Sequence, residues 1–369
     1  MPLRTLSGKH VDPRKGRGAA INPEGRFEKV EREAYDDGWA HADSADETAL
    51  KTQVTEEHAA SIISRNQSPD IPFTQSINPY QGCEHGCIYC YARPTHAYRN
   101  LSPGVDFETR IFAKVNAALL LRRELSKPGY RCEVISLGAN TDPYQPAERK
   151  LNITRGILEV CAEFNQPIGI ITKNALVERD LDILVPMAQK RLVNVFVSVN
   201  NLDHDIARRL EPRCVAPQRR IETIRALSQA GVPVGVLVAP VIPFLTDDQI
   251  EGVLEAAYAA GATQAGYVVL RLPYEVKTLF RDWLERHYPL KAKHVMSRVH
   301  DLRGGRDNDP NFGSRMRGQG EFAELLSKRF AIAKRRIGYD ARGRMLRNAS
   351  LDTTLFRVPG PAEKQMSLF

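Results

Sequence analysis

Long hydrophobic runs are missing from this chain of 369 residues. Its most apolar stretch, residues 232–245, is interrupted by three prolines and is shorter than the roughly 20 apolar residues of a membrane-spanning helix. Residues 1–17 contain no apolar core of the kind that a secretory signal requires. We therefore expect no membrane association and a cytoplasmic location.

Cysteine is also scarce, with six residues in the chain, which excludes a disulfide scaffold. Three of the six fall within eight positions, and no second C-x2-C pair occurs. Such a cluster in a chain without a leader indicates metal binding before disulfide formation. The clustered residues are Cys83, Cys87 and Cys90, and the isolated ones are Cys132, Cys161 and Cys214.

The positive charge is unevenly distributed along the chain. The net charge is +8, but residues 291–369 hold 17 Lys and Arg against 8 Asp and Glu, whereas residues 1–290 hold 35 against 36. A basic surface favours anionic partners. An anionic substrate or a nucleic acid, if one binds, is therefore expected to meet residues 291–369.

Three regions follow from the pattern of apolar residues. Residues 1–70 form a polar N-terminal arm, residues 71–272 alternate strand-like and helical segments, and residues 273–369 form a basic helical extension. Alternation of strands and helices predicts an α/β fold with a parallel sheet, and six strands favour a partial (β/α)6 TIM-type barrel. The predicted strands are 74–77, 132–138, 167–172, 193–199, 233–239 and 267–270, and the predicted helices are 153–164, 181–189, 217–229 and 247–260.

The extension contains two predicted amphipathic helices, residues 276–287 and a segment around residues 322–330. Between them lies a loop rich in glycine and arginine, residues 303–320. Arginines on an adaptable backbone can hold phosphates, whereas the alternative is a structural loop whose Asp and Arg pair internally. The arginines concerned are Arg303, Arg306, Arg315 and Arg317.

The cysteine cluster has the spacing C-x3-C-x2-C and directly follows a predicted strand. That position places it at the carboxyl end of the strand, which is the active face of parallel α/β barrels. Three thiolates can hold a four-iron cluster and leave one iron open to another ligand. The alternative is a zinc site completed by His85 or His96.

With an aromatic residue, Tyr89, just before its third cysteine, the loop resembles that of the radical SAM superfamily. The resemblance implies that Cys83, Cys87 and Cys90 hold a [4Fe–4S] cluster whose open iron binds S-adenosylmethionine (SAM). It also implies an electron donor of the flavodoxin or ferredoxin type. Electron transfer would split the SAM sulfonium and yield a 5′-deoxyadenosyl radical that abstracts hydrogen from a substrate.

Over roughly residues 75–245 the chain resembles the spore photoproduct lyase branch of that superfamily. Tyrosines flank the third cysteine, and polar residues follow the predicted strands in the same order as in that branch. The resemblance implies that a lysine binds the SAM carboxylate and that a backbone segment meets its adenine. It also implies that hydroxyl and amide side chains bind the ribose hydroxyls or the carboxylate. Taken singly, each could be an ordinary strand-end cap. The implied cofactor-binding residues are Tyr89, Lys173, Ser198, Asn200 and Ala239.

The chain departs from that branch at the end of the second strand. The branch carries a hydrogen-donating cysteine there, but residues 137–146 contain none, which argues against repair by the lyase mechanism. These residues form a polar cluster that we expect to line the active site, unless it is only an Asp-Pro turn. The candidate catalytic residues are Tyr91, Asn140, Asp142 and Tyr144, whereas Glu148 and Arg149 are expected to face solvent.

Two functions remain open from the sequence. The first is a radical SAM enzyme that abstracts hydrogen from an unidentified substrate, for which nucleic acid is one candidate. The second is a non-catalytic protein that binds nucleic acid and contains a zinc or iron–sulfur site.

Overall fold

The computed structural model describes residues 16–27, 50–340 and 351–360. Its main sheet has seven strands in the order β10-β9-β8-β7-β6-β3-β2. Neighbouring strands from β3 to β10 are parallel, and β2 pairs antiparallel with β3 at one edge. These six parallel strands confirm the predicted partial barrel. The bounds are β2 Ile63–Arg65, β3 Gln75–Ile77, β6 Ile135–Leu137, β7 Ile168–Thr172, β8 Val193–Ser198, β9 Val234–Val241 and β10 Gln264–Val269.

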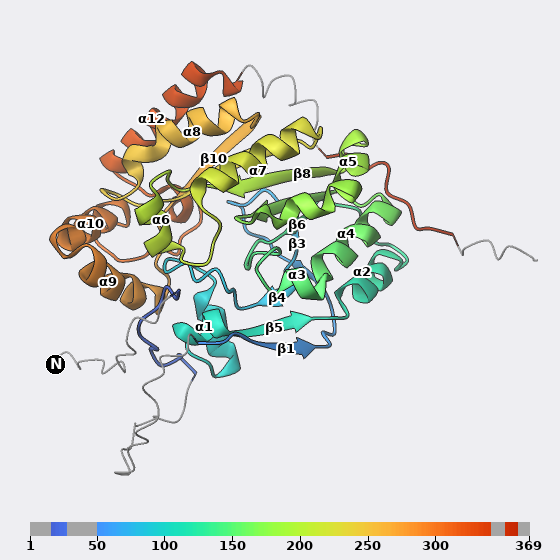
Figure 1. Cartoon of the computed structure of the whole chain (residues 1–369), viewed down its shortest axis with the longest axis horizontal. Helices are drawn as coiled ribbons and strands as arrows, with labels where there is room; N and C mark the ends of the chain where they lie inside the picture. Colours follow the sequence, from blue (N-terminus) through green and yellow to red (C-terminus); the bar gives the residue numbers. More distant parts are fainter. Residues whose placement is uncertain (1–15, 28–49, 341–350, 361–369) are drawn as a thin grey trace, which may run out of the picture.

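Helices follow one another around the outside of these strands, as Figure 1 shows. Three of the predicted helices have the bounds expected from their periodicity, because each presents one apolar stripe to the sheet. The covering helices are α2 Ala117–Leu125, α4 Ile153–Phe164, α5 Leu181–Gln189, α7 Pro217–Gln229 and α8 Ile250–Ala259. Short helices lie in the connections: η1 Arg93–Arg99, α1 Val105–Thr109, α3 Glu148–Leu151, η2 Ala175–Asp180, α6 His204–Leu210 and η3 Asp247–Gln249.

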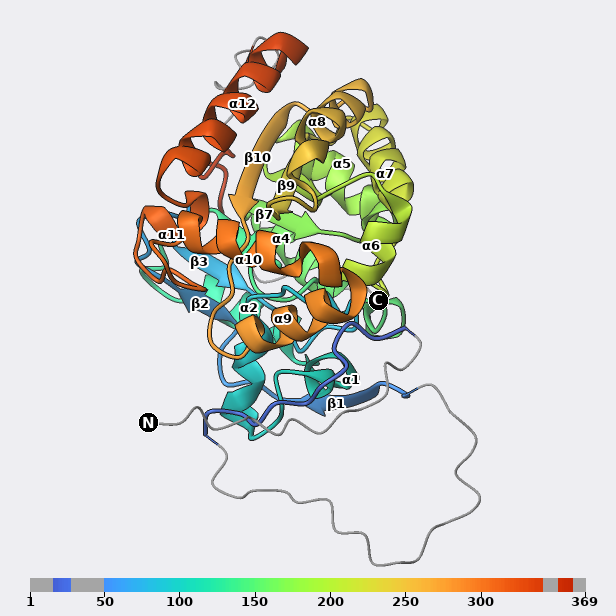
Figure 2. The same cartoon turned by 90° about the vertical axis from the view of Figure 1, so that its left-hand side faces the viewer.

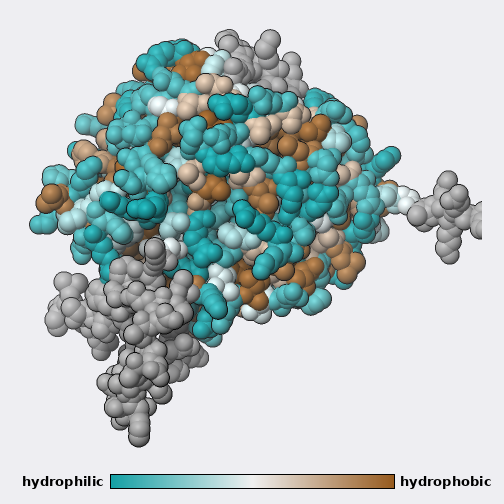
Figure 3. Space-filling model, viewed as in Figure 1, coloured by the Kyte–Doolittle hydropathy of each residue, from teal (hydrophilic) through white to brown (hydrophobic). Residues whose placement is uncertain are grey.

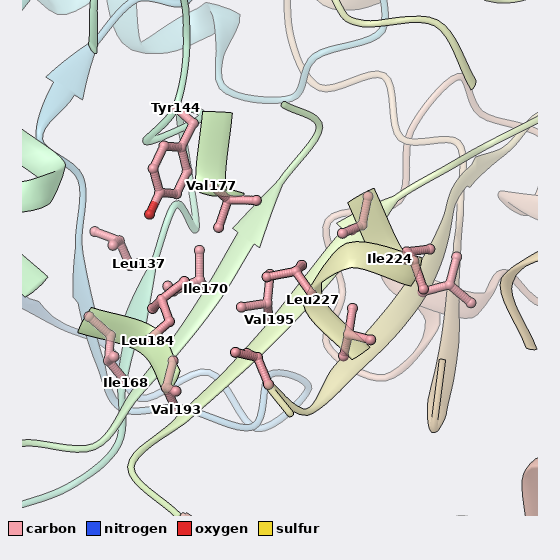
Figure 4. Packing of buried hydrophobic residues seen from close by; sticks show 14 of the residues in the cluster. Leu137, Tyr144, Ile168, Ile170, Val177, Leu184, Val193, Val195, Ile224 and Leu227 are labelled. Carbon is pink, nitrogen blue, oxygen red and sulfur yellow. The ribbon is translucent and has the colours of Figure 1, made fainter. Parts of the chain in front are cut away.

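The main core lies between the sheet and this helical layer. The strands read as near-continuous Val and Ile, which is typical of parallel strands. Figure 4 shows their apolar side chains meeting those of η2, α5 and α7. This packing fixes the strands relative to one another and thereby the edge at which all six of them end.

A smaller sheet pairs segments from both sides of the cysteine loop. It has the order β1-β5-β4, with β1 Gln53–Glu57, β5 Arg110–Lys114 and β4 Tyr80–Gln81, and lies at the lower edge of Figure 1. Strands β1 and β2 fall within residues 1–70, so part of the predicted polar arm pairs in both sheets. The boundary at residue 70 remains a prediction.

The chain after the last strand is helical, as expected. Its helices are α9 Val276–His287, α10 Pro289–Leu302, α11 Ser314–Arg317 and α12 Glu321–Ile337. The sequence did not predict α10, whose buried positions are Val295, Met296, Val299 and Leu302. Residues 341–350 and 361–369 of the basic extension lie outside the described residues.

The arginine-rich loop joins the last barrel strand to the first strands. The Arg303 side chain, 1% exposed, donates to the carbonyl oxygens of Val269 and Leu270 at the end of β10. Arg315 of α11 donates to both carboxylate oxygens of Asp70 at 2.6 and 2.7 Å, in the connection between β2 and β3. Figure 2 shows α11 beside these strands. These two arginines therefore have structural partners, although neither pairs with an Asp of the loop as the structural alternative had it, whereas Arg306 and Arg317 are exposed.

Candidate functional site

Polar residues from several loops meet at the carboxyl edge of the parallel sheet. The cysteine loop follows β3 and the short β4, the polar cluster of residues 138–146 follows β6, and Lys173 follows β7 directly. Asn200 follows β8 and Arg271 follows β10. Because the strands are parallel, residues far apart in the sequence come together at this edge.

The cysteine loop is anchored through its backbone. The Cys83 amide donates to the Phe107 carbonyl at 2.9 Å, and the Ile88 amide donates to the Leu210 carbonyl at 3.0 Å. The side chain of Gln145 accepts from the Glu84 amide and donates to the carbonyl just before Cys83. These bonds fix the loop to α1, to α6 and to the segment after β6.

A buried ion pair supports the loop from beneath. Arg93 donates to the carbonyl oxygens of Gly86 and Cys87 at 3.1 and 2.9 Å and pairs with Glu108 at 2.5 Å. Both side chains are fully buried. Glu108 also accepts from the two amides of residues 18–19, each at 2.9 Å. The N-terminal segment therefore takes part in fixing the cysteine loop.

The three thiols lie close enough to influence one another electrostatically. Burial raises the pKa of Cys83 well above its usual value, and Asp142, Cys87 and Cys90 add to this rise. Burial followed by Cys87 also raises the pKa of Cys90. A hydrogen bond with Cys214, whose Sγ lies 3.8 Å from that of Cys87, lowers the pKa of Cys87 despite its burial.

Cys214 is thus a fourth thiol beside the three clustered cysteines, although the sequence analysis named it only among the isolated ones. Cys161 lies in the apolar core, and Cys132 lies 3.6 Å from Gln166 at the opposite end of the sheet.

The two histidines of the zinc alternative have other contacts. His96 is bound through Nε2 to the Arg110 carbonyl at 2.9 Å, and its Nδ1 has no partner among the described residues. His85 Nε2 lies 3.3 Å from the Asn174 amide nitrogen. Within residues 16–27, 50–340 and 351–360, no three His, Cys, Asp or Glu side chains converge on a point that could hold a single metal ion. In an iron–sulfur cluster each thiolate binds a different iron atom, so the thiolates need not converge on one point.

Tyr89 connects the loop to a second buried ion pair. Its hydroxyl donates to Glu211, and Glu211 pairs with Arg220, which also donates to the Ser198 carbonyl at 3.1 Å. Burial would raise the pKa of Glu211, but Arg220 and Lys173 outweigh it and lower that pKa. Tyr89 therefore positions the third cysteine against the end of β8. The sequence analysis assigned roles to neither partner in this pair.

Asp142 connects the polar cluster to the next strand. Its carboxylate accepts from the Thr172 hydroxyl and the Lys173 amide, both at 2.7 Å, and lies 3.4 Å from His85 Nδ1. Burial lowers the pKa of His85. Asp142 is thus an anchor between β6 and β7 beside Cys83, whereas the Asn140 side chain is exposed at the same edge.

Tyr144 is placed in the core and not at the edge. It is 0% exposed, its hydroxyl donates to Asp180 at 3.1 Å, and Figure 4 shows its ring beside Val177. This position does not support the predicted catalytic contact. Glu148 was expected to face solvent, but it is fully buried and accepts from the hydroxyl of Tyr80, which corrects that prediction.

Tyr91, which directly follows Cys90, is an exposed candidate catalytic residue. Its side chain is 45% exposed, and its hydroxyl donates to the Ala139 carbonyl at the start of the polar cluster. The Arg271 guanidinium lies 5.5 Å from the centre of its ring. Tyr91 therefore contacts the segment after β6 and lies near the residue that follows β10.

The predicted SAM-binding residues adjoin the loop at the ends of β7, β8 and β9. Burial would lower the pKa of Lys173, but Cys87 and Glu211 outweigh it and raise that pKa. No carboxylate among the described residues lies within 4.0 Å of its ammonium group. Asn200 is 1% exposed, and its Nδ2 donor lacks a partner in the part of the chain that the structure describes. Ser198 is buried at the end of β8, and Ala239 is partly exposed near the end of β9.

Comparisons with known proteins find a family model, relatives and solved structures that are similar to this chain. A family model described as the Radical SAM superfamily matches residues 77–257. An uncharacterised protein of Mycobacterium tuberculosis is 39% identical over 280 residues, which are 74% of this chain and 77% of that protein. An uncharacterised protein of Methanocaldococcus jannaschii is 26% identical over 216 residues, which are 58% of this chain and 76% of that protein.

Two of the similar solved structures are spore photoproduct lyase mutants. One has a TM-score of 0.55 and 14% identity, with 77% of this chain and 79% of that chain covered. The other, with bound AdoMet and dinucleoside spore photoproduct, has a TM-score of 0.53 and 13% identity over the same shares. Such low identity establishes a common fold and nothing finer. Among the described residues, no helix is long and apolar enough to cross a membrane.

Proposed function

Because this chain belongs to the radical SAM superfamily and is an enzyme of that class, we propose that it holds a [4Fe–4S] cluster on Cys83, Cys87 and Cys90. The observation that carries the proposal is the grouping of these thiols on one anchored loop beside the Lys173 ammonium. Cationic neighbours favour thiolates, which are the form that binds iron. When bound, the cluster and SAM together supply the 5′-deoxyadenosyl radical that abstracts hydrogen.

The residues at the ends of β7 and β8 fit the polar edge of SAM. The Lys173 ammonium suits a carboxylate, and the unpartnered Nδ2 of Asn200 is a buried donor that a ligand acceptor would satisfy. Ser198 lies beside Asn200, and Ala239 offers strand backbone to the adenine. These residues would orient SAM against the cluster, while Tyr89 and Glu211 hold the loop in position.

The exposed groups beside the loop suit a substrate. Tyr91 and Asn140 lie at the open edge, and Asp142 acts beneath them as a positioning residue. The substrate stays unidentified, and an anionic one, with nucleic acid as a candidate, fits the charge of residues 291–369. Superfamily chemistry requires a reductant, for which we propose a flavodoxin-type or ferredoxin-type donor in the cytoplasm, where thiols stay reduced.

The test is reductive cleavage of SAM by the full chain, reconstituted with iron and sulfide under anaerobic conditions. We expect a brown protein with the iron content of one [4Fe–4S] cluster that releases 5′-deoxyadenosine after addition of dithionite. Cys87→Ala should abolish both the colour and the release. Cys132→Ala is the matched control, because Cys132 lies at the opposite end of the sheet and should leave both unchanged.

Two results would contradict the proposal. A colourless protein with one tightly bound zinc would favour the metal-dependent nucleic-acid-binding alternative. Equal release of 5′-deoxyadenosine by the wild type and Cys87→Ala would separate SAM cleavage from the cysteine loop.

A further inference from the structure

Arg271 lies two residues beyond the end of β10, at the same edge of the sheet as the cysteine loop. Its guanidinium lies 5.5 Å from the centre of the Tyr91 ring, and Tyr91 directly follows Cys90. The side chain is partly buried, and this burial followed by the charge of Arg315 lowers its pKa. Arg271 therefore brings positive charge to the open side of the candidate active site.

The guanidinium of Arg271 is poorly satisfied by the protein. Its Nη1 donates to the Met316 sulfur at 3.6 Å, and thioether sulfur is a weak acceptor. Its Nε atom is buried without a hydrogen-bond partner, and no carboxylate of the described residues lies within ion-pair distance. Buried donors are normally satisfied, so a missing partner indicates a ligand or water.

Two neighbouring arginines differ from Arg271 in this respect. Arg315 makes a bidentate ion pair with Asp70. Arg303 donates to four backbone carbonyls, two at the end of β10 and two in α11. Both lie near enough to Arg271 to influence pKa values, Arg315 that of Arg271 and Arg271 that of Arg303. The protein thus uses two of the three for structure and leaves the third, beside the candidate site, for another anion.

We propose that Arg271 binds an oxyanion of the substrate, either a phosphate or a carboxylate, next to Tyr91. The planar guanidinium presents paired donors that match two oxygens of either group. Burial in a region with two further arginines strengthens the attraction for an anion. The assignment of this anion to a substrate rests on the proposed function, and it moves the expected anion contact from the arginine-rich loop to the end of β10.

The test measures binding of small anions to the full reconstituted chain with SAM present and no reductant. Inorganic phosphate and acetate are titrated separately by calorimetry into the wild type, Arg271→Met and Arg306→Met. We expect Arg271→Met to weaken binding of the preferred anion about tenfold or more, as for loss of a charged hydrogen-bonded pair. Arg306→Met is the matched control, since Arg306 is an exposed arginine of the nearby loop.

The two probes separate the sources of the oxyanion. Preference for phosphate identifies a phosphorylated or nucleotide substrate, and preference for acetate identifies a carboxylate. Equal affinity of Arg271→Met and the wild type for both anions overturns the proposal. Weaker SAM binding in Arg271→Met, measured in the same experiment, also overturns it, because the guanidinium would then serve the cofactor.

A second measurement uses only the wild-type protein and so does not depend on the folding of a variant. Phosphate or acetate should protect Arg271 of the wild type from phenylglyoxal, while Arg306 reacts equally with and without the anion. Modification of Arg271 at the same rate in both conditions contradicts the proposal. Neither measurement involves SAM cleavage, so failure of the radical chemistry and failure of this inference give different results.

Discussion

Among the described residues, buried charged groups are paired at one end of the carboxyl edge of the barrel and unpaired at the other. On the cysteine-loop side, Arg93 pairs with Glu108 and Arg220 pairs with Glu211, all four nearly or fully buried. At the end of β10, Arg271 has no such carboxylate within the described residues. Removing charge from water is costly, and a paired charge offsets that cost within the fold. We infer that the paired groups hold the loop, whereas Arg271 and, at the end of β8, Asn200 each keep a buried donor without a partner among the described residues for the ligands proposed above.

The largest expected effect comes from breaking a paired group. Glu211→Gln leaves the Arg220 guanidinium without its charge partner, so we expect the free energy of unfolding to fall by about 3–5 kcal/mol. Urea unfolding of the metal-free protein measures it. Glu255→Gln, which breaks the exposed pair with Arg336, is the control and should cost about 0–1 kcal/mol. Equal losses in the two variants would remove the distinction between the regions.

The next largest effect is expected when the buried His96, near the cysteine loop, becomes protonated. Burial lowers the pKa of His96 to about 4, whereas an unfolded histidine titrates near 6.5. The unfolded state therefore binds the proton first, and stability should fall as the pH drops from about 6.5 towards 4. At pH 4.5 the loss from this group amounts to about 2.5 kcal/mol.

Unfolding of the wild type and His96→Gln at pH 7 and pH 4.5 isolates this contribution. Glutamine can keep a donor to the Arg110 carbonyl without acquiring a charge. Protonation of other buried groups, including His85, also destabilises the protein on acidification. The relevant quantity is therefore the difference in pH dependence between the wild type and His96→Gln. A pH dependence that is identical in both proteins would rule out His96 as the cause.

A smaller effect is expected from an unpaired group. Asn200→Ala removes the buried donor proposed for SAM, so SAM affinity should fall about tenfold while the free energy of unfolding changes little. Calorimetric titration of the oxidised, reconstituted protein measures the affinity. Asn194→Ala lies near the start of the same strand and should bind SAM as the wild type does. Loss of affinity in both variants would indicate a general effect on β8.

The smallest effect is expected on the exposed surface. Hydrophilic side chains cover most of the face in Figure 3, and Arg306 is similarly exposed, so Arg306→Ala should change the free energy of unfolding by no more than about 0.5 kcal/mol. The buried Arg303 should be clearly more sensitive to the same substitution. Comparable losses in the two variants would show that Arg306 also has a structural role.

Local patterns in the sequence predicted much of the fold. Periodicity gave the bounds of α4, α5 and α7, and the alternation of elements gave the parallel strands. The pairing of β1 with β5 and the contact of Arg315 with Asp70, 245 positions apart, depend on tertiary structure that no local window contains. The short, strongly polar strands β1 and β2 carry no apolar alternation to reveal them.

The candidate site was predicted in the same uneven way. The cysteine spacing gave the loop directly, and the resemblance gave residues that the fold brings to the edge of the sheet. Tyr144 lies in the core and away from the open edge, because a polar segment at a strand end can still turn one side chain inward. Cys214 and Arg271 belong to no recognised spacing, and only the tertiary contacts with Cys87 and Tyr91 identify them.

The central claim is that the cysteine loop and the unpaired groups beside it form one site in which SAM meets a cluster. Electron paramagnetic resonance of the reduced, reconstituted protein tests this most directly during titration with SAM. We predict that SAM changes the cluster signal in the wild type and that Asn200→Ala needs about tenfold more SAM for the same change. A cluster signal that stays the same at every SAM concentration would contradict the account.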